Sequence, residues 1–510
     1  MTKESLLNSI LMARQRVYAV GDPTPLEQLP MANYDFEVWA KREDLGPIKA
    51  YKWRGAYNAM ASLTEEERSK GIVAASAGNH DQGVALAAKA LGCKAEIFMP
   101  ISTPEVKQNE VKRHGGDAVN IRLEGDSYDD AGIGARAYCD EQGAVYIHPY
   151  NDLATMGGQG TLADEIIMDA NKPFDRVYIA IGGGGLASSV SCWLKQFWPE
   201  CKIIGVEGVD QASMKAAIEA GEPVELKYLD VFCDGTAVRK VGSNTFDICK
   251  DLLDEIVTVT NDEVCHAVRK IWESLRAIPE PSGAMGLAAI MQDAEQGKIK
   301  SGERVLTIIC GANMDFAQLS NISRRAGIGS KSRKYLRVPI PEGKGSLVRV
   351  LKDLPDAVSI VDLQYGRIES ANQYPVIGLI GSEEDYAKID TMLAEQGAHA
   401  SDVSTEDIVG YRIINYKTDL LKHPLFVNVE FPERPGAFLE FMEKVKDVSS
   451  LCYFNYSYSG ERVGRALVGM EFDSLDDQKA CREIINNMVG GNIHAVSLVS
   501  DETLKRLLGK

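Results

Sequence analysis

Three short segments of this chain carry residue types that could serve covalent catalysis and phosphate binding. Lys52 supplies an amine that can form a Schiff base with an aldehyde. Asn79 lies in a small polar loop at 76–80, and four consecutive glycines occupy 182–185. Glycines let backbone N–H groups crowd around a phosphate at the start of a helix. Each segment alone is a weak signal, but the three in this order predict a pyridoxal 5'-phosphate site.

The glycine run has two other interpretations, a plain tight turn and a dinucleotide-binding loop. Its spacing does not fit the G-x-G-x-x-G fingerprint, and no such fingerprint follows the first expected strand. With Lys52 also present, we favour a phosphate-binding loop. The residues expected to form it are Gly182, Gly183, Gly184, Gly185 and Leu186.

Size, charge and cysteine usage narrow the class of protein. A chain of 510 residues suggests about three to four domains at ~150 residues each. The net charge of −17, without a dense Lys/Arg block, argues against nucleic acid or a membrane as the main partner and fits simple solubility. Ten scattered cysteines without a C-x-x-C pair favour reduced thiols in a cytoplasmic protein over disulfides or zinc. The first residues show neither a signal-peptide nor a transit-peptide pattern.

Short apolar strands alternate with helical patterns between residues 70 and 320, which is typical of an α/β fold with parallel strands covered by helices on both faces. Ligands of such sheets bind at the carboxyl ends of the strands. The segments 76–79, 182–185 and 310–313 each follow an expected strand, so we expect them to converge on one crevice. The expected strands are 71–75, 95–99, 118–121, 145–148, 176–181, 202–206 and 305–309.

The pattern changes near residue 330, where the basic, Gly/Ser-rich segment 323–334 indicates a linker. Beyond it, 338–351 is similar to 429–442 at a spacing of 91 residues (436 − 345). Each copy reads as a strand, a Pro-Glu-x-x-Gly turn and an amphipathic helix, which predicts two β-α-β-β-α-β ferredoxin-like units over 335–415 and 424–510. Because a unit of ~80 residues has a thin core, we expect the two copies to pack together.

Together these motifs resemble the biosynthetic threonine dehydratases (threonine ammonia-lyases), which are fold-type II pyridoxal-phosphate enzymes. The resemblance covers nearly the whole chain and includes the C-terminal repeat. It implies a two-lobed catalytic domain over 1–330 followed by two ACT-like regulatory domains. The tandem repeat separates the long, regulated dehydratases from their shorter catabolic relatives. The matching segments are 51–56, 76–83, 158–161, 182–186, 280–284 and 311–313.

The resemblance also implies roles at the cofactor. Lys52 holds pyridoxal 5'-phosphate and then removes the proton from the substrate Cα, and Asn79 hydrogen-bonds the phenolic oxygen. Cys310 lies where the fold type places a Ser, Thr or Cys beside the pyridine nitrogen, although a lone buried cysteine is more often inert packing. Glu280 lies near the ring or the substrate hydroxyl. Thus Lys52, Asn79, Cys310 and the glycine run form the expected cofactor site.

For the substrate, Ser76 and the helix start that follows it are expected to bind the carboxylate. Ala77 has no titratable side chain, whereas the similar serine racemases carry a serine there that protonates the opposite face, so we expect elimination without racemisation. We count Ser76 and Ala77 with Lys52 as catalytic. His80 could serve a metal or acid–base chemistry, but we favour a packing role. The expected substrate contacts are Ser76, Gly78, Asn79, His80, Gln159 and Gly160.

The function that the resemblance implies is the conversion of L-threonine, and some L-serine, to a 2-oxo acid and ammonia. For threonine this is the first step of isoleucine biosynthesis, with isoleucine as feedback inhibitor, valine as opposing ligand and a homotetramer as the assembly. The segment 362–365 of the first copy departs from the second, which leaves open whether the first copy binds an effector. An oligomerisation module without a ligand is the alternative for the whole C-terminal region. The expected regulatory residues are Glu433, Gly436, Phe454, Asn455 and Tyr456.

Several alternatives stay open at this stage. Another fold-type II enzyme, such as L-serine dehydratase, threonine synthase or a β-replacement synthase, shares the cofactor residues, although Ala77 and the repeat favour the regulated dehydratase. A non-catalytic pyridoxal-phosphate-binding amino-acid sensor is a second alternative, and a dehydrogenase lacks its glycine fingerprint. Asp234 and Glu207 could bind a cation, but exposed carboxylates are the commoner case, and no metal site is predicted.

Overall fold

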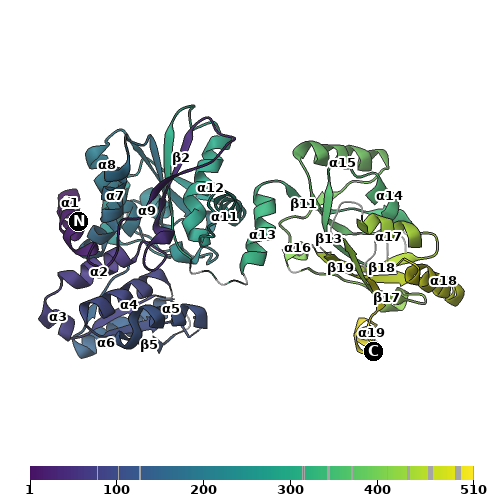
Figure 1. Ribbon diagram of the computed structural model, residues 1–510, viewed down its shortest axis with the longest axis horizontal. Coiled ribbons are helices and arrows are strands. Elements are labelled where there is room, and N and C mark those ends of the chain that lie inside the picture. The colour runs from purple at the N-terminus through teal and green to yellow at the C-terminus, as the bar shows by residue number, and fades with distance from the viewer. Residues whose placement is uncertain are drawn as a thin grey trace. The chain divides into compact units, whose positions relative to one another are not determined.

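The computed structural model divides the chain into two compact units, Met1–Gly329 and Ser330–Lys510 (Figure 1). Each unit has its own sheets and its own buried core. Within the described part of the chain, no helix is long and apolar enough to cross a membrane. The structure describes residues 1–510 except 77, 102, 126–127, 313, 315, 317, 342–344, 369–371, 411, 433–436, 458–462, 489–494 and 509–510.

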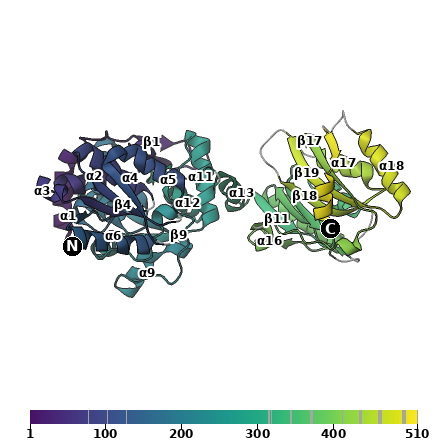
Figure 2. The ribbon, with the colours of Figure 1, turned by 90° about the horizontal axis from the view of Figure 1, so that it is seen from below.

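The smaller lobe of the first unit is built on a four-stranded parallel sheet in the order β5-β4-β3-β6. Side chains alternate between its two faces, so that Ile72 and Ala74 pack under α2, α4 and α5, while Val73 and Ala75 pack against α6 (Figure 2). The elements are α2 (Trp53–Ser62), α3 (Glu65–Ser69), β3 (Ile72–Ala75), α4 (Asn79–Leu91), β4 (Ala95–Met99), α5 (Glu105–Gly115), β5 (Val119–Leu123), α6 (Tyr128–Gln142) and β6 (Val145–Tyr146).

The larger lobe has a six-stranded sheet in the order β1-β2-β10-β7-β8-β9, parallel except for β1. All six residues of β10 are buried, as expected for a strand covered on both faces. The strands are β1 (Leu26–Leu29), β2 (Glu37–Arg42), β7 (Arg176–Ala180), β8 (Lys202–Gly208), β9 (Glu255–Val259) and β10 (Arg304–Ile309). The helices are α1 (Lys3–Val17), α7 (Leu153–Asp169), α8 (Gly185–Phe197), α9 (Ser213–Ala220), α10 (Ser243–Leu252), α11 (Asn261–Leu275), α12 (Pro281–Glu295) and α13 (Gln318–Gly329).

Two separate apolar cores cover the faces of this larger sheet. One core joins it to α1, α7, α8 and α10, and the other joins it to α11 and α12. All seven expected strands are present, each with its ends within two residues of the expectation. The α/β fold with helix-covered parallel strands is therefore confirmed, and the strands divide between two sheets, as the expected two-lobed domain requires.

The second unit contains an eight-stranded sheet in the order β16-β11-β15-β13-β18-β19-β17-β20. Its strands are β11 (Arg333–Arg337), β13 (Ser359–Gly366), β15 (Val376–Ile380), β16 (Ser401–Asp402), β17 (Leu425–Pro432), β18 (Ser450–Ser457), β19 (Val463–Glu471) and β20 (Ala495–Leu498), beside the short pair β12 (Ile340–Pro341) and β14 (Asn372–Gln373). Its helices are α14 (Ser346–Lys352), α15 (Glu383–Glu395), α16 (Asp407–Gly410), α17 (Ala437–Val445), α18 (Leu475–Asn486) and α19 (Asp501–Leu507).

The two sequence copies meet at the centre of this sheet. Strand β13 of the first pairs antiparallel with β18 of the second, and Leu363 lies opposite Tyr456. One continuous core under α14, α15, α17 and α18 contains side chains from both copies. The expectation that the copies pack together is confirmed.

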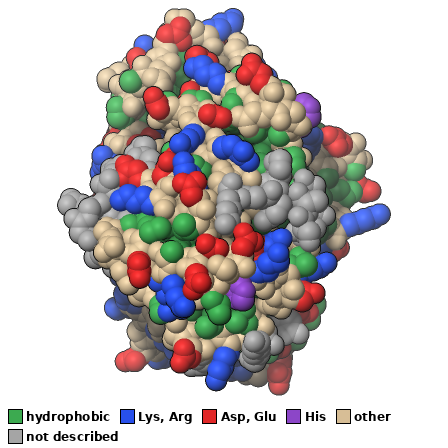
Figure 3. Space-filling view, turned by 90° about the vertical axis from the view of Figure 1, so that its right-hand side faces the viewer, with side chains coloured by type: hydrophobic (Ala, Val, Ile, Leu, Met, Phe, Trp, Pro, Cys, Tyr) green, Lys and Arg blue, Asp and Glu red, His purple; other side chains and the backbone are tan. Residues whose placement is uncertain are grey.

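On the outer surface shown in Figure 3, Lys, Arg, Asp and Glu side chains are interspersed among small apolar groups, as in a solvated face.

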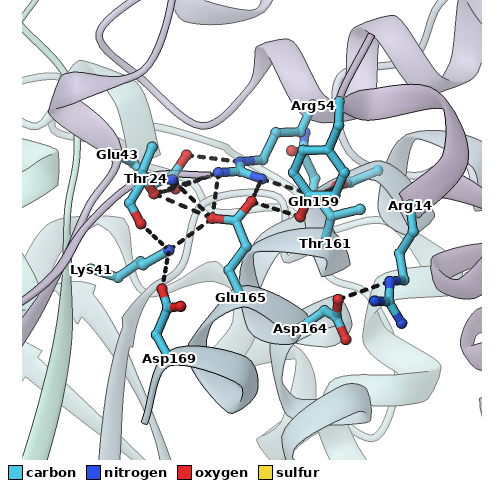
Figure 4. Close-up of polar contacts among 12 residues, drawn as sticks. Arg14, Thr24, Lys41, Glu43, Arg54, Gln159, Thr161, Asp164, Glu165 and Asp169 are labelled. Atoms are coloured by element: carbon cyan, nitrogen blue, oxygen red, sulfur yellow. Dashed lines mark hydrogen bonds and ion pairs between the residues drawn. The ribbon is translucent and has the colours of Figure 1, made fainter. Parts of the chain in front are cut away.

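A buried cluster of charges joins α2 of the smaller lobe to β2 and α7 of the larger lobe (Figure 4). Arg54, in the first turn of α2, is fully buried and donates hydrogen bonds to Glu43 (Nε to Oε2, 3.0 Å) and Glu165 (Nη2 to Oε2, 3.0 Å). Lys41 of β2 lies 2.7 Å from Glu165 Oε2. Burial alone would raise the pKa of Glu165, but Arg54 and Lys41 hold it below its usual value. Two cations thus balance two carboxylates.

Helices α2 and α7 approach closely because glycines face each other between them. A Cβ on Gly158 would lie 2.4 Å from the carbonyl oxygen of Arg54 and 2.6 Å from Cα of Gly55. A Cβ on Gly55 would lie 2.6 Å from the carbonyl oxygen of Thr155. Both neighbours are backbone atoms, which cannot move aside as a flexible side chain can. This contact therefore fixes the start of α2 against α7.

Replacing Gly158 by Ala is expected to destabilise the protein by about 1–3 kcal/mol, because the added methyl forces α2 and α7 apart. The matched control is Gly132→Ala in α6, where the nearest atom to a new Cβ is Arg136 Nη1 at 3.9 Å. The control should be neutral or stabilising by about 0.5–1 kcal/mol, since Ala is the better helix former. Urea unfolding of both variants checks this, and equal midpoints would contradict it.

Replacing Arg54 by Met is expected to destabilise the protein by about 3–5 kcal/mol, because Lys41 alone then faces two buried carboxylates. The control is Arg14→Met. The Arg14 side chain is 43% exposed, and its Nε lies 3.0 Å from Asp164 Oδ2. The loss of stability in this variant should stay within about 1 kcal/mol. Urea unfolding at neutral pH compares the two, and a similar loss in both variants would show that the buried cluster is not stabilising.

Candidate active site

A cavity lies at the carboxyl ends of β7 and β10, which is where parallel sheets commonly bind their ligands. Asn79, the glycine run 182–185 and Cys310 all line it, so the expected convergence is found for these three segments. Asn313 lies outside the described residues. The other residues that line the cavity include Tyr51, Lys52, Tyr150, Gln159, Leu186, Gly235, Thr236, Glu280 and Ser282.

The glycine run forms a loop between β7 and α8 that no larger residue could form. Gly184 has φ of +90°, and a Cβ on Gly183 would lie 2.3 Å from the ring of Tyr150. Thr245 Oγ1 donates a 2.7 Å hydrogen bond to the carbonyl of Gly183, which holds that carbonyl. Helix α8 begins at Gly185, and the N–H groups of a first helical turn lack partners within the helix. The loop is thus suited to an anion such as a phosphate.

Lys52 is the N-cap residue of α2, directly before the helix that the buried Arg54 cluster fixes. Its Nζ lies 3.4 Å from the carbonyl oxygen of Gly235, a long contact, and 5.9 Å from the Tyr51 ring centroid. Among the described residues, no carboxylate forms an ion pair with this amine. The amine is therefore placed on the cavity wall without a strong competing partner.

Three polar groups complete the wall. Asn79 Nδ2 donates a 2.8 Å hydrogen bond to Glu280 Oε1. Burial, and then Asp234, raise the pKa of Glu280 to about 7. Burial, and then the charge of Glu280, raise the pKa of the Cys310 thiol well above its usual value, so the thiol is neutral. An amine, an amide, a neutral thiol and a glycine loop together fit a pyridoxal phosphate, which needs a partner for its aldehyde, phenolic oxygen, ring nitrogen and phosphate.

Other expected site residues are placed differently. Ser76 Oγ accepts a 3.2 Å hydrogen bond from the N–H of Gly78, closing the loop, and neither residue lies on the described wall of the cavity. His80 Nε2 lies 2.9 Å from the carbonyl oxygen of Ile147, and burial lowers its pKa to about 3. This geometry favours the packing interpretation of His80. Ala77 lies outside the described residues.

Gln159 and Gly160 lie on different sides of α7. Gln159 lines the cavity, and its Oε1 accepts a 3.2 Å hydrogen bond from the N–H of Gly55. A Cβ on Gly160 would instead lie 2.4 Å from Ile10 Cγ1 of α1, so Gly160 serves helix packing and not the cavity wall. Successive helical residues point about 100° apart, which explains the difference.

The two carboxylates considered for a cation have protein partners. Glu207 accepts hydrogen bonds from the N–H groups of Met214 (2.7 Å) and Lys215 (2.9 Å) at the start of α9. Asp234 forms an ion pair with Lys107 of α5, which connects the two lobes beside the cavity. Across the described ranges, no group of three or more His, Cys, Asp or Glu side chains could hold a metal ion.

Sequence reasoning missed Tyr150, whose ring packs against the glycine loop, and Ser282, which lines the cavity. Tyr150 follows the strand expected at 145–148, so the carboxyl-end rule could have found it. Ser282 follows Glu280 in a segment that the resemblance had already marked.

The expected regulatory residues are only partly described. Phe454 and Tyr456 are buried in the core under the helices, whereas Asn455 lies on the opposite face, where its Oδ1 accepts a 2.6 Å hydrogen bond from Arg412. Glu433 and Gly436 lie outside the described residues. The structure therefore does not place Phe454 and Tyr456 on a surface that faces a ligand.

Comparison with known proteins connects this site to a family. The family described as pyridoxal-phosphate dependent enzyme matches residues 18–311, and the one described as C-terminal regulatory domain of threonine dehydratase matches 421–508. The chain is 36% identical to the L-threonine dehydratase biosynthetic IlvA of Haemophilus influenzae, covering 93% of this chain and 92% of the relative. It is also 36% identical to the Escherichia coli protein of that name, covering 94% and 93%.

Solved structures agree with this assignment for the catalytic part of the chain. The processed form of threonine deaminase isoform 2 from Solanum lycopersicum is 38% identical, with a TM-score of 0.61 over 64% of this chain and 90% of that one. Maize serine racemase is 30% identical, with a TM-score of 0.58 over 64% and 98%. Since the match to the dehydratases extends over nearly the whole chain and includes the regulatory part, this chain belongs to the biosynthetic threonine dehydratase family of pyridoxal-phosphate-dependent enzymes.

Proposed function

We propose that this protein is a threonine ammonia-lyase, which converts L-threonine to 2-oxobutanoate and ammonia. The observation that supports this most strongly is the convergence of Lys52, Asn79 and the glycine run on one cavity in a chain related to the dehydratases over 93% of its length. The reaction balances because the water lost from Cβ is matched by the water that releases ammonia. When bound, pyridoxal phosphate supplies a ring that accepts negative charge from Cα.

Each wall residue then has a distinct task toward the cofactor. The N–H groups of 182–185 and Leu186 bind the phosphate at the start of α8. Asn79 would serve the phenolic oxygen, and the neutral thiol of Cys310 would serve the ring nitrogen. A thiol does not fix a proton on that nitrogen as a carboxylate would, which suits prompt elimination over transamination.

The amine of Lys52 would hold the cofactor, and the same amine would be the base that takes the proton from the substrate Cα. The start of α4, whose Asn79 lines the cavity, would bind the substrate carboxylate, and Ser76 would support it by closing the loop through Gly78. Ala77 has no side chain that could donate a proton, unlike the serine of the similar serine racemases, which favours elimination without racemisation. L-Serine lacks only the Cβ methyl group of L-threonine. Because one methyl group changes the binding free energy by about 1–3 kcal/mol, some L-serine is also turned over.

For the second unit we propose two ACT-like regulatory domains over 335–415 and 424–510, which bind isoleucine as inhibitor and valine as its antagonist. The separate compact unit and the regulatory-domain match at 421–508 support this proposal. We further propose a homotetramer in the cytoplasm. The reducing environment of that compartment suits ten free cysteines, nine of which are buried.

Purified protein is expected to release 2-oxobutanoate from L-threonine, and Lys52→Ala should lower kcat by about a thousandfold, because the base and the attachment point are both lost. The control is Lys70→Ala, an exposed lysine of the smaller lobe, which should keep normal turnover. A coupled assay for 2-oxo acids measures both. Normal turnover by the Lys52 variant, or turnover of L-serine alone, would contradict the proposal.

A chain that ends at Gly329 is expected to turn over L-threonine without inhibition by isoleucine, because the inhibitor binds the second unit. The complementary fragment 330–510 should bind isoleucine in a calorimetric titration. Circular dichroism first establishes that each fragment is folded. Inhibition of the shortened enzyme by isoleucine, or no heat of binding from a folded 330–510, would show that the second unit is not the isoleucine site.

A further inference from the structure

A short turn of the larger lobe, residues 233–236, forms part of the cavity wall beside Lys52. Gly235 and Thr236 of this turn line the cavity, and the carbonyl oxygen of Gly235 lies 3.4 Å from Lys52 Nζ. Lys52 directly precedes α2 of the smaller lobe, so this contact passes from one lobe to the other. The position of the turn therefore decides what surrounds the Lys52 amine.

The larger lobe holds this turn from one side. Gln211 Nε2 donates a 3.2 Å hydrogen bond to the carbonyl of Cys233. A Cβ on Gly235 would lie 3.0 Å from Ser282 Oγ, so the turn packs closely against the start of α12. The side chain of Asp234 is on the outer side of the turn, where it is partly exposed.

Lys107 of α5 holds the turn from the smaller lobe, because its Nζ forms an ion pair with Asp234 Oδ2. Lys107 is the third residue of α5, a position at which the helix dipole disfavours a cation. Its side chain is nevertheless mostly buried. The place of this lysine is thus explained by its partner in the other lobe and not by the helix in which it lies.

We propose that Lys107 is a positioning residue, which holds the 233–236 turn against Lys52 and the bound cofactor through its ion pair with Asp234. The proposal rests on the cofactor site of the proposed function. Asp234 and Gly235 are adjacent, so the ion pair and the contact with the Lys52 amine cross between the lobes at successive residues. Loss of the ion pair releases the turn on its smaller-lobe side, and small solutes then reach the cavity more readily.

An effect of charge alone is the alternative, because both residues of the pair act on Glu280. Burial and then Asp234 raise the pKa of Glu280, whereas Lys107 lowers it. Removing the two charges one at a time would thus change Glu280 in opposite directions. A positioning role instead predicts the same direction for both changes, since either one breaks the ion pair.

The reaction of hydroxylamine with bound pyridoxal phosphate tests this in the full-length holoenzyme without any amino-acid substrate. Lys107→Met and Asp234→Asn should each speed the loss of bound-cofactor absorbance by about two- to fivefold, as expected for a partly exposed ion pair. The double variant should show no further increase, because the two residues act through one contact. Lys107→Arg keeps the charge and should retain the wild-type rate.

The matched control is Lys195→Met. Lys195 Nζ lies 2.8 Å from Asp254 Oδ2, and these side chains are 16% and 39% exposed, close to the 18% and 45% of Lys107 and Asp234. Both control residues belong to the larger lobe, and neither lies on the described wall of the cavity. This variant should react at the wild-type rate. The same increase in the control, an unchanged rate in Lys107→Met, or opposite changes in Lys107→Met and Asp234→Asn would overturn the proposal.

Amide hydrogen exchange in the cofactor-free, full-length protein keeps the test decisive if a variant does not bind the cofactor. The N–H groups of Thr236 and Ala237 donate hydrogen bonds to carbonyls of the turn. Their exchange should be faster in Lys107→Met than in the wild type and the control variant, and equal exchange would also overturn the proposal. Cofactor binding without threonine turnover would contradict the proposed function alone, so the two failures are distinguishable.

Discussion

The buried guanidinium of Arg54 is the constraint on which the active-site geometry depends. Removing an arginine and two carboxylates from water costs several kcal/mol for each ion, and this cost is recovered only if every partner is in place. Glu43 follows β2, Glu165 lies on α7 and Arg54 lies on α2, so the balanced cluster determines how these elements meet. Lys52 lies two residues before Arg54. A reactive amine near the cavity is thus positioned by charges that never contact substrate.

Glycine performs two different tasks around this cluster. Gly158 and Gly55 remove side chains so that two helices can approach closely, whereas Gly183 and Gly184 leave space and conformational freedom for a loop at the start of α8. Both groups occur in short glycine-containing motifs, and the chemical difference between them is visible only in three dimensions. The packing glycines hold α2, the helix that follows Lys52, and the binding glycines line the same cavity as Lys52.

This explains which parts of the site could be predicted from the sequence. Strand alternation and the carboxyl-end rule bring Asn79, the glycine run and Cys310 together, because those rules need only the order of elements. They do not give the rotation of a helix, so Gly160 was assigned with Gln159 although it faces α1. They also do not give the division of the strands between two sheets, which depends on contacts distant in sequence.

In the second unit, pairing of β13 with β18 limits how a ligand could act. A shift of one residue in the pairing of β13 with β18 would turn the buried side chains of the shifted strand to the opposite face of the sheet. Leu363 of β13 and Tyr456 of β18 are among these buried side chains. Arg412 also binds both strands, through Asp362 Oδ2 at 2.5 Å and Asn455 Oδ1 at 2.6 Å. The two copies therefore cannot slide independently. A regulatory change must arise from movement of helices over a fixed sheet or from rotation of the whole unit.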